Sequence, residues 1–224
     1  MSFSKSRPFN QEEVAAYERK RYRGIDQRLV DWREKKIIQR FLRLTPLKSA
    51  AILLALDAPC GYGRFSRLIL SQGLGLISSD FSAAMVEQAR RKGYRSSYPV
   101  GVVADMKAGL PFRDNCFHFV LCLRFFHHLH LSAERRAVLG ELNRVCRDKL
   151  VISFYRLQPI HRLQRALRRL IHPSPTRISM LPLAVFLQEA EEAGFVVKEI
   201  RPLFRGIHAQ CIALLEKKLK PVGR

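Results

Sequence analysis

The sequence is poor in acidic residues: it has 19 aspartates and glutamates against 40 lysines and arginines, which gives a formal charge of +21 over 224 residues. Such a surface attracts polyanions, but the charge alone does not choose among nucleic acid, anionic lipid and acidic glycans. The chain also has no apolar run close to the roughly 20 residues of a spanning helix, and no apolar segment typical of a secretion signal. We therefore expect a cytoplasmic protein, either free or peripheral at the inner membrane surface.

Paired cysteines are also missing. The five cysteines are odd in number, form no C-x-x-C pair and mostly lie within apolar runs. This pattern predicts reduced cysteines in the core and disfavours a zinc site, whose ligands recur at short fixed spacings. We therefore predict no metal.

The hydrophobic content of 47% is typical of a soluble globular protein with one substantial core. Apolar residues recur at helical spacing over 11–44, which predicts one or two helices divided near Gly24. Basic residues crowd positions 19–36, where they form either a solvated helix face or a contact with a polyanion. Residues 1–10 are polar, and we expect no regular structure there.

Strands and helices alternate from residue 52 onwards. The predicted strands are 52–56, 74–79, 100–104, 117–123, 150–154, 195–201 and 208–215, and the predicted helices are 64–71, 82–92, 132–145 with Ser132 as N-cap, and one from Pro182 to a cap at Gly194. This order predicts an α/β fold: a doubly wound, Rossmann-like, mostly parallel seven-stranded sheet with helices on both faces. Residues 1–50 would form an N-terminal helical cap and 51–224 the main domain. Ligands of such sheets bind beyond the carboxyl ends of the strands.

The stretch from Ile52 to Phe65 combines a buried strand, a glycine turn and a helix start, which together can hold a nucleotide-like ligand. Gly61 and Gly63 would let the backbone approach that ligand, and the helix N-terminus offers unpaired N–H groups. Asp57 supplies an acceptor at the end of the strand.

Two further carboxylates end the next two predicted strands. Asp80 follows the glycine turn by about twenty residues, where an acid can accept both hydroxyls of a ribose. Asp105 ends the third strand, where a carboxylate can accept a hydrogen bond from the amino group of an adenine. Because Asp57, Asp80 and Asp105 share one register, we expect one ligand site rather than three unrelated surface acids.

Four segments within about 52–154 carry a resemblance to a known family: L-D-A-P-C-G-Y-G-R-F-S, S-S-D-F-S-A-A-M-V-E-Q-A-R, V-A-D-M-K-A-G-L-P-F and L-G-E-L-N-R-V-C-R-D-K-L-V-I-S. In this order they resemble the class I S-adenosylmethionine-dependent methyltransferases of the small-molecule type, which include enzymes of ubiquinone and menaquinone biosynthesis. The resemblance implies S-adenosylmethionine (S-adenosyl-L-methionine) as cofactor. It places Asp57, Cys60, Gly61 and Gly63 at the methionine part, Asp80 at the ribose, Asp105 and Met106 at the adenine, and Phe81 and Leu123 as further cofactor-binding residues.

Two positions depart from the family pattern. Pro59 stands where the family has the first glycine of its loop; proline removes an N–H and fixes φ, which bears on cofactor affinity. The usual F-D-x-V is replaced by F-H-F-V, with His118 in place of the acid. Because His118 begins its strand, at the end opposite the cofactor, we expect its consequence to be structural.

The methyl-acceptor side is predicted from residues that follow the strands. In-line methyl transfer mainly requires alignment, and a base is needed only if the acceptor must lose a proton. The catalytic candidates are His127, His128, Arg124 and Tyr155, and the acceptor-pocket candidates are Phe126, Arg156, Arg205 and His208. Histidine titrates near neutrality and suits a base, although such histidines often only satisfy loop backbone groups. Arg205 and His208 either face the acceptor or belong to a plain hairpin.

The segment 157–180 contains several arginines and no acid, with its leucines and isoleucines on one helical face. It suits an anionic membrane surface or an anionic substrate; alternatively it is a lid helix packed on the core with solvated arginines.

From these features we expect a methyltransferase that acts on a small or lipid-linked acceptor, with a hydroxyl oxygen as the first choice of atom. An RNA methyltransferase is the alternative that the high positive charge favours. A catalytically inactive cofactor-binding protein is a further alternative, for which Pro59 is the supporting feature.

Overall fold

The computed structural model describes residues 10–21, 24–44, 53–92, 99–157, 178–206 and 208–218. The predictions for residues 1–9, for most of the basic segment 157–180 and for the tail beyond 218 lie outside these residues.

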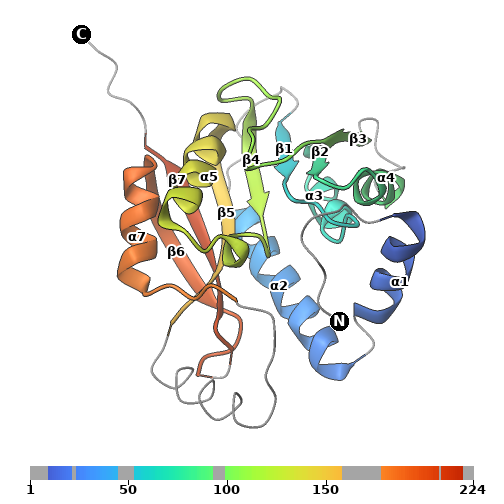
Figure 1. Ribbon diagram of the computed structural model, residues 1–224, viewed down its shortest axis with the longest axis horizontal. Coiled ribbons are helices and arrows are strands. Elements are labelled where there is room, and N and C mark those ends of the chain that lie inside the picture. The colour runs from blue at the N-terminus through green and yellow to red at the C-terminus, as the bar shows by residue number, and fades with distance from the viewer. Residues whose placement is uncertain are drawn as a thin grey trace.

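A seven-stranded sheet in the order β3-β2-β1-β4-β5-β7-β6 forms the centre of the molecule (Figure 1). Its strands are β1 Leu54–Asp57, β2 Gly75–Asp80, β3 Pro99–Val103, β4 Phe117–Cys122, β5 Cys146–Tyr155, β6 Phe195–Pro202 and β7 Gln210–Lys217. The strands β1, β2, β3, β4 and β5 run parallel to one another, whereas β7 runs antiparallel to both of its neighbours, β5 and β6. The predicted fold class is therefore confirmed, and the antiparallel last strand brings its first residues back to the edge where β1, β2 and β4 end.

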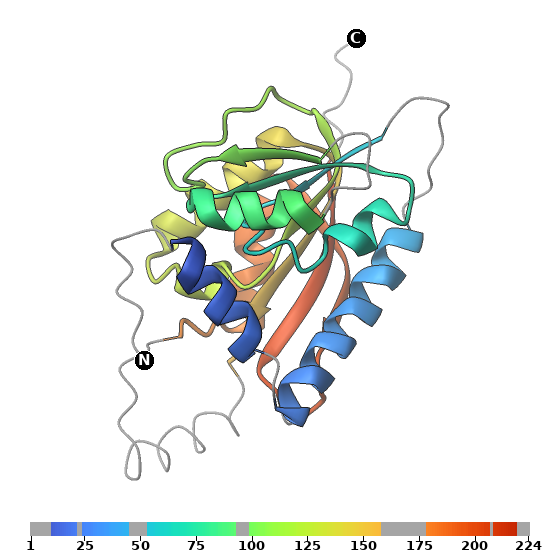
Figure 2. The same ribbon diagram turned by 90° about the vertical axis from the view of Figure 1, so that its right-hand side faces the viewer.

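Helices cover both faces of the sheet (Figure 2). They are α1 Gln11–Arg21, α2 Ile25–Arg43, α3 Ser66–Leu70, α4 Ala83–Lys92, α5 Ser132–Val145 and α7 Leu183–Glu192, with a short 3₁₀ helix, η1, at Phe126–His128. Among the described residues, one core cluster joins α2 and α3 to one face of the sheet, and a second joins α5 and α7 to the other. Neighbouring residues of β4 divide between the clusters, because side chains alternate along a strand: Leu121 faces α2 and Val120 faces α5.

The N-terminal helices divide at Gly24, as predicted, because α1 ends at Arg21 and Gly24 is the N-cap of α2. The buried apolar residues of α2, such as Ile38 and Phe41, belong to the same cluster as the sheet residues Leu121 and Ile212. This helix is therefore packed into the core rather than laid over it.

The prediction of Ser132 as N-cap of α5 is wrong by one residue. The cap is Leu131, whose N–H donates to Oε2 of Glu134 at 3.4 Å. The hydroxyl of Ser132 instead lies 2.8 Å from Oε1 of Glu189 in α7, so a contact between helices takes the group that sequence reasoning assigned to the cap. At the end of α7, Gly194 has φ of 88° and ends the helix as predicted.

Several expectations from composition can be compared with the described residues. All five cysteines are free; Cys60, Cys122, Cys146 and Cys211 are buried and Cys116 is partly buried.

His118 accepts a hydrogen bond from the N–H of Leu54 at 3.3 Å, which links β4 to the start of β1 and gives this departure from the family a structural role. No helix in the described ranges is long and apolar enough to cross a membrane, and they contain no group of three side chains suited to hold a metal ion.

Candidate functional site

The carboxyl ends of β1 and β2 place two acids side by side. Asp57 ends β1 and is only 1% exposed, and its Oδ2 has no hydrogen-bond partner among the described residues. Burial raises the pKa of Asp57 to about 8; the nearby Arg64 lowers it, and the charge of Asp80 raises it further. A buried carboxyl group with an unused oxygen is a place where a cationic or donor group of a ligand would be stabilised.

Asp80 fixes the loop that follows β1. Its Oδ2 accepts the N–H of Gly61 at 2.9 Å, and its Oδ1 accepts the N–H of Ser82 at 3.0 Å. Burial raises the pKa of Asp80, although the N–H groups of Ser82 and Gly61 act in the opposite direction. The loop is tied a second time by the N–H of Cys60, which donates to the carbonyl of Ser79 at 2.8 Å. It is therefore held against the end of β2 before any ligand binds.

The two glycines of the loop have different surroundings. Gly61 has φ of 51°, and a Cβ placed on it would meet no atom within 4 Å, so its Cα faces open space. Gly63 has φ of 73°, and a Cβ there would lie 2.6 Å from Cα of Ala89 in α4. Gly63, predicted to allow close approach of a ligand, thus allows close approach of a helix. Pro59, before them, follows a cis peptide bond.

The other predicted cofactor residues lie around this edge with different exposure. Asp105 is exposed, and its Oδ1 accepts the N–H of Lys107 at 2.9 Å within a turn. Phe81 is 51% exposed, whereas Met106 and Leu123 are buried in the two core clusters. Asp57 is thus the buried acid of the edge, Asp80 is partly buried, and Asp105 lies at the surface.

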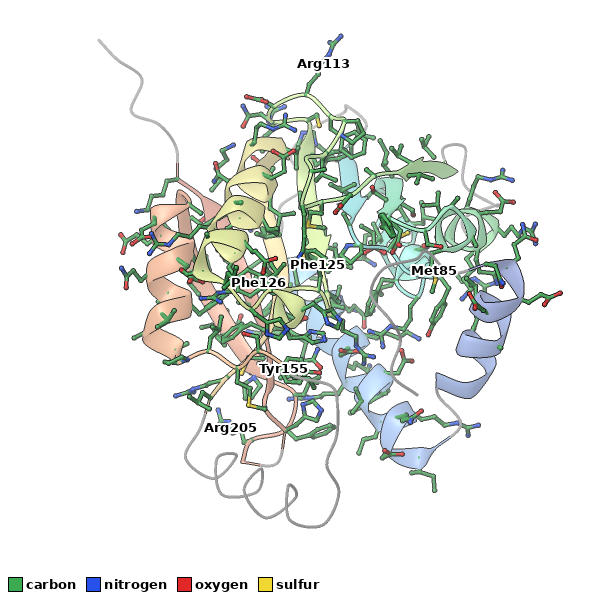
Figure 3. The ribbon with its side chains drawn as sticks, in the orientation of Figure 1. Met85, Arg113, Phe125, Phe126, Tyr155 and Arg205 are labelled. Atoms are coloured by element: carbon green, nitrogen blue, oxygen red, sulfur yellow. The ribbon has the colours of Figure 1, made fainter. Side chains whose placement is uncertain are left out.

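A row of aromatic rings continues the edge on the side of β4, β5 and β7. The ring centroids of His127 and His128 are 4.0 Å apart, those of His127 and Tyr155 are 4.9 Å apart, and those of Tyr155 and His208 are 6.1 Å apart. Nδ1 of His208 accepts the N–H of Gln210 at 3.1 Å. Four predicted residues from three distant parts of the chain therefore lie together, with Tyr155 between two histidines. Figure 3 shows Tyr155 at this edge, between Phe126 and Arg205 in that view.

Arg124, predicted as catalytic, is held by an ion pair. Its Nε and Nη2 donate to the two oxygens of Glu34 in α2 at 3.0 and 2.8 Å. Glu34 is fully buried, and Arg64 also binds it at 2.5 Å. The structure thus gives this guanidinium a structural partner, and its contact with a ligand stays a prediction.

The acceptor-pocket candidates separate in the same way. Phe126 is 1% exposed and lies in the core, 6.2 Å between ring centroids from Phe186, so it does not line the surface of the edge. Arg205 is exposed in the turn between β6 and β7, and Arg156 is partly buried, with its N–H donating to the carbonyl of Ala209 at 2.8 Å. Of the four candidates, His208 is the one that joins the row of rings.

A basic hollow of about 570 Å³ lies beside the loop, between α1, α2, α3 and α4. Its lining contains the cations Lys35, Arg64, Arg67 and Lys92, the acids Glu18 and Asp31, and Tyr62, Gly63 and Leu68. Lys92 pairs with Glu18 at 2.5 Å and lies over the ring of Tyr62. Lys35 and Arg64 both pair with Asp31. The two acids offset two of the four positive charges that line the hollow.

Sequence reasoning missed Glu34 and Gln210. Glu34 falls on the buried face of α2 with Ile37, Ile38 and Phe41. An acid at an apolar position of an amphipathic helix was the available signal, because such a group needs a buried partner. Nothing in the sequence around Gln210 shows that it reaches α2.

Comparisons with known proteins show what this chain is similar to. Residues 56–154 match a family model described as "Methyltransferase domain". Two curated relatives are malonyl-[acyl-carrier protein] O-methyltransferases: one from Legionella pneumophila, 37% identical over 130 residues, and one from Pectobacterium atrosepticum, 34% identical over 116 residues. The matches cover 56% and 52% of this chain but only 44% and 42% of the relatives, so the chain spans less than half the length of each.

Solved structures share the fold at low sequence identity. The magnesium protoporphyrin IX methyltransferase of Synechocystis PCC 6803, crystallised with bound SAH, matches with a TM-score of 0.72 and 17% identity over 93% of this chain and 98% of that one. A SAM-dependent methyltransferase of Methanosarcina mazei matches with a TM-score of 0.64 and 17% identity over 82% of this chain and 98% of that one.

Proposed function

We propose that this chain transfers a methyl group from S-adenosylmethionine to an oxygen atom of a small, lipid-linked or carrier-linked acceptor. The chain has the class I S-adenosylmethionine-dependent methyltransferase fold, with a methyltransferase domain at residues 56–154. The observation that supports the proposal is the arrangement of side chains at the edge where β1 and β2 end. The buried Asp57, with an oxygen that lacks a partner among the described residues, lies beside the loop held by Asp80. The row of rings that includes His127 and Tyr155 emerges from the neighbouring strands.

The residues of the edge fit this cofactor. Asp57 offers an unused buried oxygen to a positive group, and the ammonium and sulfonium of S-adenosylmethionine are both positive. Asp80 is already fixed by two backbone N–H groups and keeps lone pairs for the hydroxyls of a ribose. Gly61 faces open space, so its backbone is accessible to a ligand. When bound, S-adenosylmethionine supplies an electrophilic methyl group.

The acceptor would meet the row of rings. His127 lies in η1, which follows β4, Tyr155 is the last residue of β5, and His208 lies two residues before β7. A hydroxyl acceptor must lose its proton, which a histidine at this place can accept, whereas a carboxylate is already ionised and needs no base. The two curated relatives are named as O-methyltransferases, which supports oxygen as the accepting atom.

The test uses the purified chain with S-adenosylmethionine labelled in its methyl group. We would offer malonyl-acyl carrier protein, phenolic quinone precursors and total RNA in separate reactions, and follow transfer of label. Label in the carrier-linked or phenolic acceptor, lost on Asp80→Asn, is the expected result. Label in RNA alone would overturn the choice of acceptor, and absence of S-adenosylmethionine binding in calorimetry would overturn the enzyme itself.

One variant distinguishes a phenol acceptor from a carboxylate acceptor. His127→Ala should reduce transfer to a phenol by about 10²-fold or more, the usual contribution of a general base. Transfer to a carboxylate should change much less, because no proton is removed. The RNA and inactive-protein alternatives are not favoured by the comparisons.

A further inference from the structure

A buried carboxylate joins the N-terminal helix α2 to the ends of three strand regions. Glu34 has no exposed surface, and its oxygens accept three hydrogen bonds from side chains and form an ion pair with a second arginine. Oε1 is bound by Nε of Arg124 at 3.0 Å and by Nε2 of Gln210 at 2.7 Å. Oε2 is bound by Nη2 of Arg124 at 2.8 Å and by Nη2 of Arg64 at 2.5 Å.

This carboxylate is ionised at neutral pH. Burial acts to raise the pKa of Glu34, but the charges and hydrogen bonds of Arg64 and Arg124 outweigh it, so the pKa lies below its ordinary value. Two arginines and one amide donate to it, which is what a buried charge needs. Glu34 can therefore only accept hydrogen bonds, and every group that faces it must be a donor.

That requirement fixes the amide of Gln210. A glutamine side chain has an NH₂ that donates and an oxygen that accepts, and the two can exchange places when both surroundings allow it. Because the NH₂ of Gln210 must face Glu34, its Oε1 faces the opposite way, towards the phenol of Tyr155 at 3.4 Å. The hydroxyl of Tyr155 is then the donor in this long hydrogen bond.

Tyr155 is a ring of the candidate acceptor row, 4.9 Å from His127 and 6.1 Å from His208 between ring centroids. The direction of its O–H decides whether the phenol oxygen presents a lone pair or a hydrogen atom to its surroundings. An ionised group on α2 thus acts on this ring through one intervening amide.

We propose that Glu34 is a positioning residue for the acceptor: its charge fixes the orientation of the Gln210 amide and so directs the hydroxyl hydrogen of Tyr155 towards Gln210. The consequence for methyl transfer rests on the function proposed above. The relay itself does not, and it can be measured without any acceptor.

The experiment follows the ¹³Cζ resonance of Tyr155 in protein labelled at tyrosine, assigned by its loss in Tyr155→Phe. Glu34→Gln removes the charge but keeps the shape, so the amide of Gln210 loses its fixed orientation and the resonance should move. In a Gln210→Met background, the same Glu34→Gln change should leave the resonance in place, because the intervening amide is gone. Glu192→Gln, a surface glutamate of α7, is the matched control and should not move it.

A resonance that stays in place in folded Glu34→Gln protein would overturn the proposal, as would an equal movement in the Gln210→Met background. If Glu34→Gln does not fold, Gln210→Met is measured alone, and an unmoved Tyr155 resonance overturns the proposal, because the hydrogen bond on which it depends would be absent. A relay confirmed in protein that transfers no methyl group would refute the proposed function and leave this inference standing.

Discussion

At the scale of single residues, the site depends on ionisable side chains that are buried at the carboxyl ends of the strands. Asp57 is the clearest case, because burial raises its pKa to about 8 and one of its oxygens has no partner among the described residues. When such a carboxyl group is ionised, it destabilises the folded protein but strengthens the binding of a cationic ligand. Stability and ligand binding therefore respond to pH in opposite directions.

Asp57→Asn tests this point. The folded-state pKa of Asp57 lies above the unfolded value, so the stability that protonation provides is full below about pH 4 and is lost as pH rises towards 8. The variant removes that loss, and its advantage over the wild type should grow by up to about 1.4 kcal/mol per pH unit between pH 5 and 8. Urea unfolding without ligand at several pH values measures it. A constant difference across this range would contradict the pKa.

Binding by the same pair of proteins gives the opposite sign. The affinity of the wild type for S-adenosylmethionine should rise from pH 6 to 8 as Asp57 ionises, and Asp57→Asn should bind more weakly with a flatter pH profile. Calorimetry on both proteins provides the measurement, and a parallel profile in the variant would remove Asp57 from the ligand site.

Gly63 and Gly61 offer a matched comparison. Gly63→Ala should cost several kcal/mol, because its new Cβ would lie 2.6 Å from the backbone of Ala89 and its φ is 73°. Gly61→Ala carries only the strain of its positive φ, about 1 kcal/mol, since nothing lies near its Cβ position. Thermal unfolding of both variants decides, and equal losses would show that α4 moves aside.

At the scale of elements, two helices on one face of the sheet are joined by a buried ion pair. Arg135 of α5 donates to Glu189 of α7 through Nε at 2.8 Å and Nη2 at 2.7 Å, with side chains 7% and 2% exposed. Sequence periodicity predicted both helices and most of the strands to within a few residues, because these follow from local apolar patterns. It did not predict this pair or the cap at Leu131, since both depend on which helix lies beside which.

Glu189→Leu should destabilise the protein by about 3–5 kcal/mol, because it leaves the guanidinium of Arg135 buried without its carboxylate partner. Arg135→Met combined with Glu189→Leu should recover most of that loss, since apolar side chains can replace a buried pair. Denaturant unfolding of the single and double variants forms the cycle. A double variant as unstable as the single one would mean that the pair cannot be replaced by packing.

At the scale of the whole molecule, charge and site give separate predictions. The sequence alone indicated the site region, because Asp57, Asp80 and the histidines follow strands that the pattern located. It could not indicate that Arg124 belongs to Glu34, 90 residues away, since neither residue carries a local signal of the other. The distribution of the +21 charge over the folded surface was equally beyond its reach.

Binding of the chain to RNA or to anionic vesicles should weaken steeply between 50 and 200 mM salt, as expected when contacts to a polyanion release counterions. Affinity for S-adenosylmethionine should change little over the same range, because Asp57 is buried and Asp80 is partly buried. Filter binding and calorimetry at matched salt give both curves. A shared salt dependence would place the ligand among surface charges.

The bond between Glu34 and Gln210 joins residues 176 positions apart, from the second helix to the last strand. During synthesis, the segment containing Glu34 leaves the ribosome long before β7 exists, so its carboxylate lacks the amide of Gln210 until the C-terminal hairpin docks. A nascent chain that stops short of residue 210 would keep its nucleotide-binding half but lack the amide beside Tyr155. Ribosome-bound fragments of increasing length would therefore acquire affinity for the cofactor before they acquire the ability to process an acceptor.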